Sequence, residues 1–312
     1  MLHGWIVLDK PVGLGSTQAV SAVKRLLREA EEPKTKVGHG GTLDPLASGV
    51  LPIALGEATK LAGRMLDATK AYAFTIKFGE ETDTLDTEGE VVATSDVRPT
   101  LAEVEAVLPR FTGPIEQVPP AYSALKIAGK RASDRARAGE EVELKSRSVT
   151  IYDLVVRHPR ESGGPASATG QRDSRVGGHD EVTLEATVSK GTYIRSLARD
   201  IAHALGTVGH VSYLRRTRAG PFGLEQAVSL DFLTEIAKAR ELTRAVLPLQ
   251  AALDDIPALP VTPEQAQLLR HGQQLFGFPA KPGLCMATLE ETPVALVEAS
   301  ADGLRVVRGF NL

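Results

Sequence analysis

Apolar residues recur along the chain in two periods, which predict a mixture of strands and helices. Alternating or short continuous apolar runs are typical of strands, and they lie at residues 5–8, 71–78, 149–156, 182–188 and 210–217. The run AYAFTIKF at residues 71–78 alternates most cleanly, with Tyr72 on the same face as three other apolar side chains. By this pattern alone, Tyr72 packs in the core.

Apolar residues three or four apart predict helices elsewhere. Ser16 or Thr17 begins the first helix, and Thr100 opens a capping box that begins another. A helix with Arg195 near its start ends at Gly206, a natural C-terminal cap. Residues 46–55 are expected to begin with a helical turn, and further helices are predicted at residues 60–66 and 230–249.

A small unit rich in strands is predicted at the end of the chain. Residues 254–260 have the composition of a linker, and Thr262 then caps a short helix that ends at Gly272. Three strands are predicted at residues 284–289, 294–298 and 304–308, with Asp302 and Gly303 in a hairpin turn. We therefore divide the chain into a large domain, residues 1–253, and a small one, residues 254–312.

Three polar segments interrupt the pattern of the large domain. Residues 80–90 are acidic and predict a surface loop. Residues 124–150 are rich in lysine and arginine and predict a mobile basic arm. Residues 158–180 contain few apolar side chains and many Gly, Ser and Arg, which predicts a disordered insertion without a catalytic role.

The chain has 312 residues and a formal net charge of −3, so it lacks the overall basic balance that is usual for nucleic-acid binders. The charge is unevenly spread, however, because residues 190–218 carry six Lys and Arg against Asp200 alone. A basic face on a mildly acidic protein can bind phosphates. Solvated surface charges are the equally simple alternative, and composition does not choose between them.

The numbers and spacing of cysteine and histidine residues argue against disulfides and metal sites. Cys285 is the single cysteine, so no disulfide within the chain and no cysteine-based zinc site is expected, in keeping with a cytoplasmic location. The seven histidines show no metal-ligand spacing. The first residues lack the basic region and apolar run of a signal peptide, and no apolar run is long enough to span a membrane.

Residues 37–52, VGHGGTLDPLASGVLP, place one carboxylate, Asp44, among three nearby glycines and directly before Pro45. Glycines allow unusual backbone conformations and close approach of a ligand, which suggests a shaped loop that presents an acid. The alternative is structural: Asp followed by Pro is also how many helices begin, with Asp as the N-cap. The local pattern by itself favours the cap, because caps are common and catalytic acids are rare.

Four segments in order resemble the TruB-type bacterial tRNA pseudouridine synthases. They read LDKPVGLGST at 8–17, GHGGTLDPLASGVLP at 38–52, VPPAYSALKIAGKRASDRAR at 118–137, and SKGTYIRSLARDIAHALG followed by LRRTRAGPF within 189–222. Several motifs in the same order and spacing are far more specific than one short motif. This resemblance favours a catalytic Asp44 over a helix cap.

The resemblance implies an α+β pseudouridine-synthase fold. Its central sheet would be mixed and mostly antiparallel, flanked by helices, and a small PUA-like β-rich domain that binds RNA would end the chain. The implied activity is isomerisation of uridine to pseudouridine at position 55 in the T loop of tRNA, by a monomer without cofactor, metal or protein partner. Two alternatives remain open: a guide-RNA-directed synthase subunit, and an RNA-binding or tRNA-folding protein with little catalysis.

The resemblance also implies roles for individual residues. Asp44 would be the catalytic acid, Arg195 its ion-pair partner, and Tyr72 the residue that stacks on the flipped uracil and takes part in proton transfer. Further substrate contacts would come from His39, Tyr193 and Leu214. Contacts to the RNA backbone would come from Lys10, Lys126, Lys130, Arg215 and Arg216. The sequence departs from the family pattern at Gly40, where a threonine is usual, and at Ser133, where an aromatic residue is usual.

Overall fold

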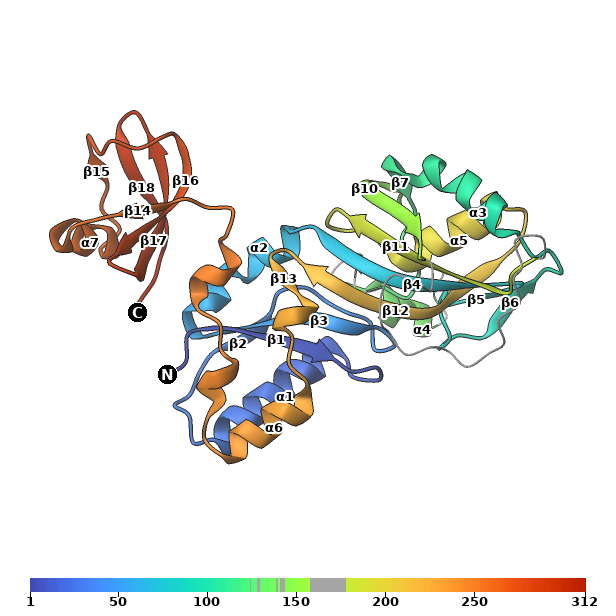
Figure 1. Ribbon diagram of the computed structural model, residues 1–312, viewed down its shortest axis with the longest axis horizontal. Helices are drawn as coiled ribbons and strands as arrows, with labels where there is room; N and C mark the ends of the chain where they lie inside the picture. Colours follow the sequence, from blue (N-terminus) through green and yellow to red (C-terminus); the bar gives the residue numbers. More distant parts are fainter. Residues whose placement is uncertain (124, 128–129, 139, 141–143, 158–177) are drawn as a thin grey trace. The chain divides into compact units, whose positions relative to one another are not determined.

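The computed structural model describes residues 1–123, 125–127, 130–138, 140, 144–157 and 178–312 (Figure 1). These residues form two compact units. The first unit contains Met1–Pro45, Gly49–Leu66 and Ala219–Leu312, and the second contains Leu46–Ser48 and Asp67–Arg218. The second unit is therefore inserted into the first along the chain.

The first unit is built on three neighbouring strands. Their bounds are β1 Gly4–Lys10, β2 Val37–His39 and β3 Ser48–Leu55, and both β1 and β2 pair antiparallel with β3. The helices are α1 Ser16–Glu29, α2 Ala62–Asp67 and α6 Leu230–Lys238, with 3₁₀ turns η1 Gly56–Leu61, η3 Leu224–Gln226, η4 Leu242–Ala245 and η5 Leu249–Ala252 and the short strand β13 Phe222–Gly223. Helices α1 and α6 pack side by side (Figure 1). Every residue of β3 is buried, which places the core of this unit along that strand.

The first strand contacts a segment from late in the chain. The backbone N–H of Trp5 donates to the carbonyl of Leu247 at 2.9 Å, and the N–H of Leu247 donates back at 2.7 Å. The indole of Trp5 donates to the carbonyl of Leu249 at 3.2 Å and packs against Phe222, with ring centroids 5.5 Å apart. Residues 219–253 therefore complete the core that β1 begins.

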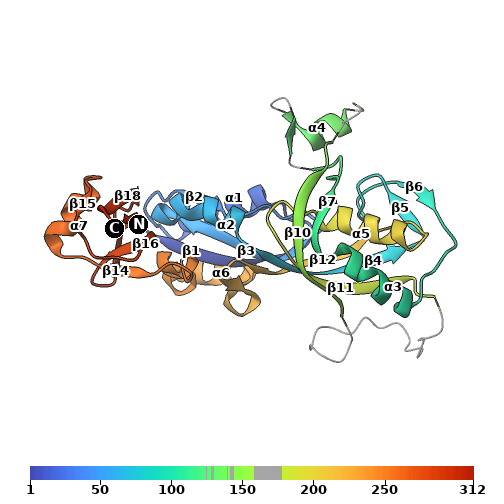
Figure 2. The same ribbon diagram turned by 90° about the horizontal axis from the view of Figure 1, so that it is seen from above.

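The second unit is a sheet with strands in the order β12-β4-β11-β10-β7. The strands are β4 Lys70–Phe78, β5 Glu80–Thr82, β6 Val91–Thr94, β7 Gly113–Gln117, β8 Lys126–Ile127, β9 Lys130–Arg131, β10 Arg147–Val156, β11 Glu181–Val188 and β12 Gly209–Ala219. The helical segments are α3 Leu101–Val107, η2 Leu108–Phe111, α4 Ala132–Arg137 and α5 Ile194–Ala204. The β4–β11, β11–β10 and β10–β7 pairs are all antiparallel. Figure 2 shows α4 standing apart from these strands.

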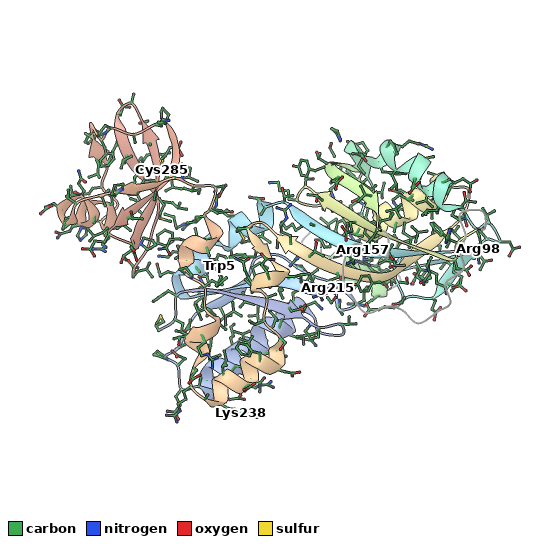
Figure 3. All side chains as sticks on the ribbon, viewed as in Figure 1. Trp5, Arg98, Arg157, Arg215, Lys238 and Cys285 are labelled. Carbon is green, nitrogen blue, oxygen red and sulfur yellow. The ribbon has the colours of Figure 1, made fainter. Side chains whose placement is uncertain are left out.

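The C-terminal residues form a second sheet with its own core. The elements are β14 Ala258–Pro260, α7 Pro263–Arg270, β15 Leu275–Phe276, β16 Gly283–Leu289, β17 Thr292–Ser300 and β18 Gly303–Gly309, and the strand order is β14-β16-β17-β18-β15. Cys285 is buried in this core together with Leu269, Val297 and Leu304 (Figure 3). The boundary at residue 253 stays a prediction, since the first compact unit continues to Leu312.

Most predicted elements are confirmed, and four expectations are wrong. Residues 46–55 do not begin with a helical turn but form strand β3 from Ser48. The helix expected over 230–249 ends at Lys238, because Arg240 adopts a left-handed backbone with φ of 61°. Residues 80–90 are not simply a surface loop, since they begin with β5 and bury Asp86. The 254–260 linker ends in β14, which pairs parallel with β16.

The basic arm and the insertion are only partly described. Helix α4 and the short β8–β9 pair belong to the arm, whereas the side chains of Lys126 and Lys130 and the insertion residues 158–177 lie outside the described residues. Within the described residues, no helix is long and apolar enough to cross a membrane.

Candidate active site

Asp44 lies in a loop that backbone hydrogen bonds hold on both sides. Before it, the Ser16 hydroxyl accepts from the Leu43 N–H at 2.8 Å and donates to the Leu43 carbonyl at 2.9 Å. After it, the Pro45 carbonyl accepts from the Gly13 N–H at 2.8 Å. The side chain of Asp44 is half-buried. The loop therefore presents a carboxylate from a fixed backbone, as a catalytic acid requires.

Asp44 does not cap a helix. Residues 45 and 46 form a turn, and strand β3 begins at Ser48, so no helical N–H groups follow the carboxylate. The Asp-Pro sequence, which favours a helix cap, is instead followed by a turn that leads into the buried strand β3. The structure removes the strongest structural alternative for this residue.

Lys10 supports the same loop from inside the protein. Its side chain is fully buried, and its ammonium donates to the carbonyls of Pro11 at 2.8 Å, Leu14 at 2.6 Å and Pro45 at 3.3 Å. Burial argues against direct contact of this ammonium with an RNA phosphate, the role implied by the resemblance. In this structure Lys10 joins the loop after β1 to the loop that bears Asp44.

Gly40, the departure inside the central motif, is explained by its packing. A Cβ atom built on Gly40 lies 2.6 Å from Cβ of Met65 and 3.5 Å from Cβ of Pro52. Side-chain atoms do not approach so closely, and Met65 therefore occupies the space that a larger residue at position 40 needs. Glycine at position 40, in place of the usual threonine, thus leaves room for the Met65 side chain of α2.

This exchange gives a test by substitution. We expect Gly40→Thr to destabilise the fold by about 1–3 kcal/mol through overpacking against Met65. The Gly40→Thr, Met65→Gly double variant should regain part of that loss, because only glycine removes the Cβ atom that lies 2.6 Å away. Met65→Gly alone should be destabilising because it leaves a cavity. Urea unfolding of the four proteins measures the coupling. Additive effects of the two changes would show that the two positions do not compete for the same space.

In the second unit, the structure places Tyr72 and Leu214 on neighbouring strands. Tyr72 is half-buried on β4, and Leu214 is 5% exposed on β12, the strand beside it in the sheet. The sequence pattern by itself predicts core packing for Tyr72, and the residue keeps part of its surface exposed. A half-buried ring can pack on a flat ligand with its open face.

Tyr193 is held just before helix α5. The side chain of Gln117, fully buried, accepts from the Tyr193 N–H at 2.8 Å and donates to the Tyr193 carbonyl at 3.1 Å. The Arg147 guanidinium lies over the Tyr193 ring, 4.8 Å from its centroid, a cation–π arrangement. Neither Gln117 nor Arg147 is singled out by the sequence, because each contacts Tyr193 from a strand that is distant from it along the chain.

Arg195 is buried and held by three acceptors in the second unit. Its guanidinium donates to the carbonyls of Thr84 at 2.8 Å and Tyr122 at 2.9 Å, and pairs with the carboxylate of Asp86 at 3.2 Å. Arg195 is 4% exposed and Asp86 2% exposed. The expected carboxylate beside Arg195 is thus present, and one partner is Asp86; pairing with Asp44 remains a prediction.

Asp86 is the functional candidate that sequence reasoning missed. Its carboxylate accepts from the Thr84 hydroxyl at 2.6 Å and from the Glu88 N–H at 3.0 Å, besides pairing with Arg195. Within the sequence it is one acid in an acidic stretch, and nothing local distinguishes it from the exposed ones. The residue before it, Leu85, adopts a left-handed backbone with φ of 62°.

Four of the six cations in the basic segment 190–218 are ion-paired or buried, whereas Arg218 is exposed. Lys190 pairs with Asp67 at 2.8 Å, Arg199 pairs with Asp200 at 2.8 Å, and Arg195 is buried with Asp86. Arg216 is 1% exposed, so its burial argues against the RNA-backbone role implied by the resemblance. Arg215, labelled in Figure 3, donates to the Ser48 hydroxyl at 3.3 Å.

Lys70, at the start of β4, is a further buried cation. Burial, together with the nearby charge of Arg216, lowers the pKa of the Lys70 ammonium to about 8. Between that pKa and the value of about 10.4 for an unfolded chain, the unfolded state binds more protons, so the free energy of unfolding rises with pH. Relative to Lys70→Met, we expect the wild type to gain about 2 kcal/mol between pH 7 and pH 9.5. Denaturant unfolding of both proteins tests this, and a constant difference would contradict the lowered pKa.

Comparison with known proteins identifies the family. The model of the TruB family pseudouridylate synthase N-terminal domain matches residues 24–194, and that of the tRNA pseudouridylate synthase B C-terminal domain matches residues 195–254. The chain belongs to the TruB family of pseudouridylate synthases. Members of this family are isomerases, so the predicted enzyme class is confirmed.

Relatives within the TruB family match over the whole chain. The tRNA pseudouridine synthase B of Novosphingobium aromaticivorans is 61% identical over 100% of this chain and 98% of its own length. That of Zymomonas mobilis is 60% identical over 99% of this chain and 96% of its own length. A solved H/ACA RNP bound to a substrate RNA containing 2′-deoxyuridine matches with a TM-score of 0.70 and 26% identity, over 99% of this chain and 86% of that one. The predicted α+β pseudouridine-synthase fold with a C-terminal PUA-like domain is thereby confirmed.

Proposed function

We propose that the protein converts uridine to pseudouridine at position 55 in the T loop of tRNA. The Asp44 loop carries this proposal: the backbone on both sides of Asp44 is held by bonds to the Ser16 hydroxyl and the Gly13 N–H, and no helix uses the carboxylate as a cap. The names of the relatives, which are tRNA pseudouridine synthases over the full chain length, favour tRNA as the substrate.

The reaction breaks the N1–C1′ bond, turns the uracil and rejoins it through C5, with no net redox change or hydrolysis. Asp44 supplies the nucleophile, and attack on ribose C1′ or on uracil C6 uses the same carboxylate. Such a carboxylate needs a positive partner in a dry pocket, and we assign that role to Arg195. Its three acceptors fix the guanidinium in advance, so little reorganisation is needed during the reaction.

The target base must leave its stack before Asp44 can reach it. We assign the stacking surface and a part in proton transfer to Tyr72, which is half-buried. Tyr193 and Leu214 line the uracil pocket, and His39 lies against the displaced nucleotides. Gln117 and Arg147 would then act as positioning residues for Tyr193. Backbone contacts fall to Arg215 and to Lys126 and Lys130 of the basic arm.

Incubation of the purified protein with an unmodified tRNA transcript, followed by mapping of pseudouridine, tests the proposal. We expect one pseudouridine, at position 55, without added guide RNA, metal or cofactor. A requirement for a guide RNA would support the guide-directed alternative. Tight tRNA binding without any pseudouridine would support the RNA-binding alternative.

A further inference from the structure

A large cavity in the first unit is lined by cations that no proposed catalytic role uses. It has a volume of about 1060 Å³ and lies between the C-terminal half of α1, the α1–β2 connection and η1. Four cations of this cavity are exposed side chains on α1 and the connection, namely Lys24, Arg28, Lys34 and Lys36. None of these four takes part in an ion pair within the described parts of the chain. We call them the cavity cations.

Most carboxylates near the cavity cations form ion pairs with other cations. Glu29 pairs with Arg25 at 3.5 Å, and Glu31 pairs with Arg240 of the segment after α6. Glu57, which lines the cavity, pairs with Lys60 at 2.6 Å. Glu32 is the other carboxylate of the lining, so the cavity cations outnumber the carboxylate that faces them. A net positive cavity on a protein of net charge −3 concentrates anions locally.

A second cavity continues from the first along α1. It has a volume of about 620 Å³, shares Ser21 and Arg28 with the larger one, and reaches Gly13 after β1. Gly13 in turn donates to the Pro45 carbonyl beside Asp44. The two cavities are thus neighbours along α1, and the smaller one is lined by Gly13, which is bonded to the loop that bears Asp44.

The number of residues between the cavity cations and Asp44 limits the distance between them. Lys36 is eight residues from Asp44, so their Cα atoms lie at most about 28 Å apart. This is less than one helical turn of a DNA duplex, about 34 Å. One folded RNA can therefore reach both places. An extended row of exposed cations also suits a polymer of phosphates better than one small phosphate, which needs a closed set of donors.

We propose that the cavity cations bind the sugar–phosphate backbone of the substrate tRNA outside its T loop. The inference rests on the proposed function, since it takes tRNA as the substrate. Helix α1 places Arg28 about 18 Å from Ser16, which bonds to Leu43 beside Asp44. With the target base in the Asp44 loop, a phosphate at the cavity cations therefore belongs to nucleotides well away from that base. Four of the six cations in segment 190–218 are ion-paired or buried, so the cavity cations add positive charge to that of Arg215 and Arg218.

The test compares two RNAs and two charge-reversal variants. The RNAs are a full-length unmodified tRNA and an isolated T stem–loop oligonucleotide. The variant Lys34→Glu, Lys36→Glu reverses two cavity cations. The matched control, Arg110→Glu, Lys238→Glu, makes the same change of net charge at two exposed cations that line neither cavity; Lys238 is labelled in Figure 3. Melting curves establish that each variant folds, and both RNAs are assayed for dissociation constant and pseudouridine formation.

We expect the cavity variant to bind tRNA at least about tenfold more weakly, with a salt slope about 1.8 smaller because two phosphate contacts are lost. Its binding and modification of the T stem–loop should equal those of the wild type, and the control should lose less than about twofold for either RNA. Unchanged tRNA binding, equal losses in variant and control, or equal losses for both RNAs would each overturn the inference. Absence of pseudouridine with the wild type would instead overturn the proposed function.

Discussion

Replacing Asp44 with asparagine is expected to give a folded protein that binds tRNA and forms no detectable pseudouridine. Asparagine keeps the size and a side-chain oxygen but loses the negative charge and the nucleophile. The hydrogen bonds described for this loop pass through the backbone of Leu43 and Pro45, and the substitution leaves those groups in place. We expect single-turnover pseudouridine formation to fall by about 10⁴-fold or more, the scale on which hydrolases respond to loss of a catalytic triad member.

The control for this experiment is Asp231→Asn, which removes an exposed carboxylate in the first turn of α6. It should leave turnover unchanged and thereby exclude a general effect of net charge. Thermal melting of both variants separates loss of catalysis from loss of fold. Near-normal turnover by the asparagine variant would disprove the mechanism assigned to Asp44.

The second large effect is expected at the buried pair of Arg195 and Asp86. Removal of one partner from a buried ion pair leaves an uncompensated charge and costs about 3–5 kcal/mol. We expect Asp86→Asn to fall at the lower end of this range, because asparagine still offers an acceptor to the guanidinium. Modification should slow as well, since a neutral amide then replaces the charged carboxylate among the three acceptors that fix Arg195.

A double variant separates the structural from the catalytic contribution of this pair. Arg195→Met, Asp86→Leu removes both charges together, and apolar pairs of similar volume often replace buried ion pairs at little cost. We therefore expect stability closer to wild type than that of Asp86→Asn, but no pseudouridine formation. A stable and active double variant would contradict the catalytic role of Arg195. A cost below about 1 kcal/mol for Asp86→Asn would show that the pair contributes little to the fold.

The elements that the sequence predicts well are those decided by local chemistry. The alternation of residues 71–78 agrees with β4, Lys70–Phe78, to within one residue. At Thr100 the capping box forms as expected, with the hydroxyl accepting from the Glu103 N–H and the Glu103 carboxylate accepting from the Thr100 N–H. Period and capping are properties of a few neighbouring residues, so they are visible without the rest of the fold.

The expectations that fail depend on distant residues. Asp44-Pro45 has the local pattern of a helix start, yet the following residues form a strand that is buried throughout and pairs with both β1 and β2. Tertiary burial overrides the local preference there. In the same way, Asp86 meets an arginine more than a hundred residues away, and Gly40 fits a side chain from α2. Each of these contacts becomes visible only when the chain is folded.

The inserted position of the second unit has a consequence for synthesis on the ribosome. Strand β1 needs the segment near Leu247, so at about 5–20 residues per second its backbone partner emerges about 12–50 s after Trp5 itself. Most of the second unit, Asp67–Arg218, is continuous and its strands pair with one another, so it can fold during this interval. The nascent chain therefore holds an apolar first strand without its full cover for tens of seconds, and during this interval the strand is exposed to aggregation and to capture by chaperones.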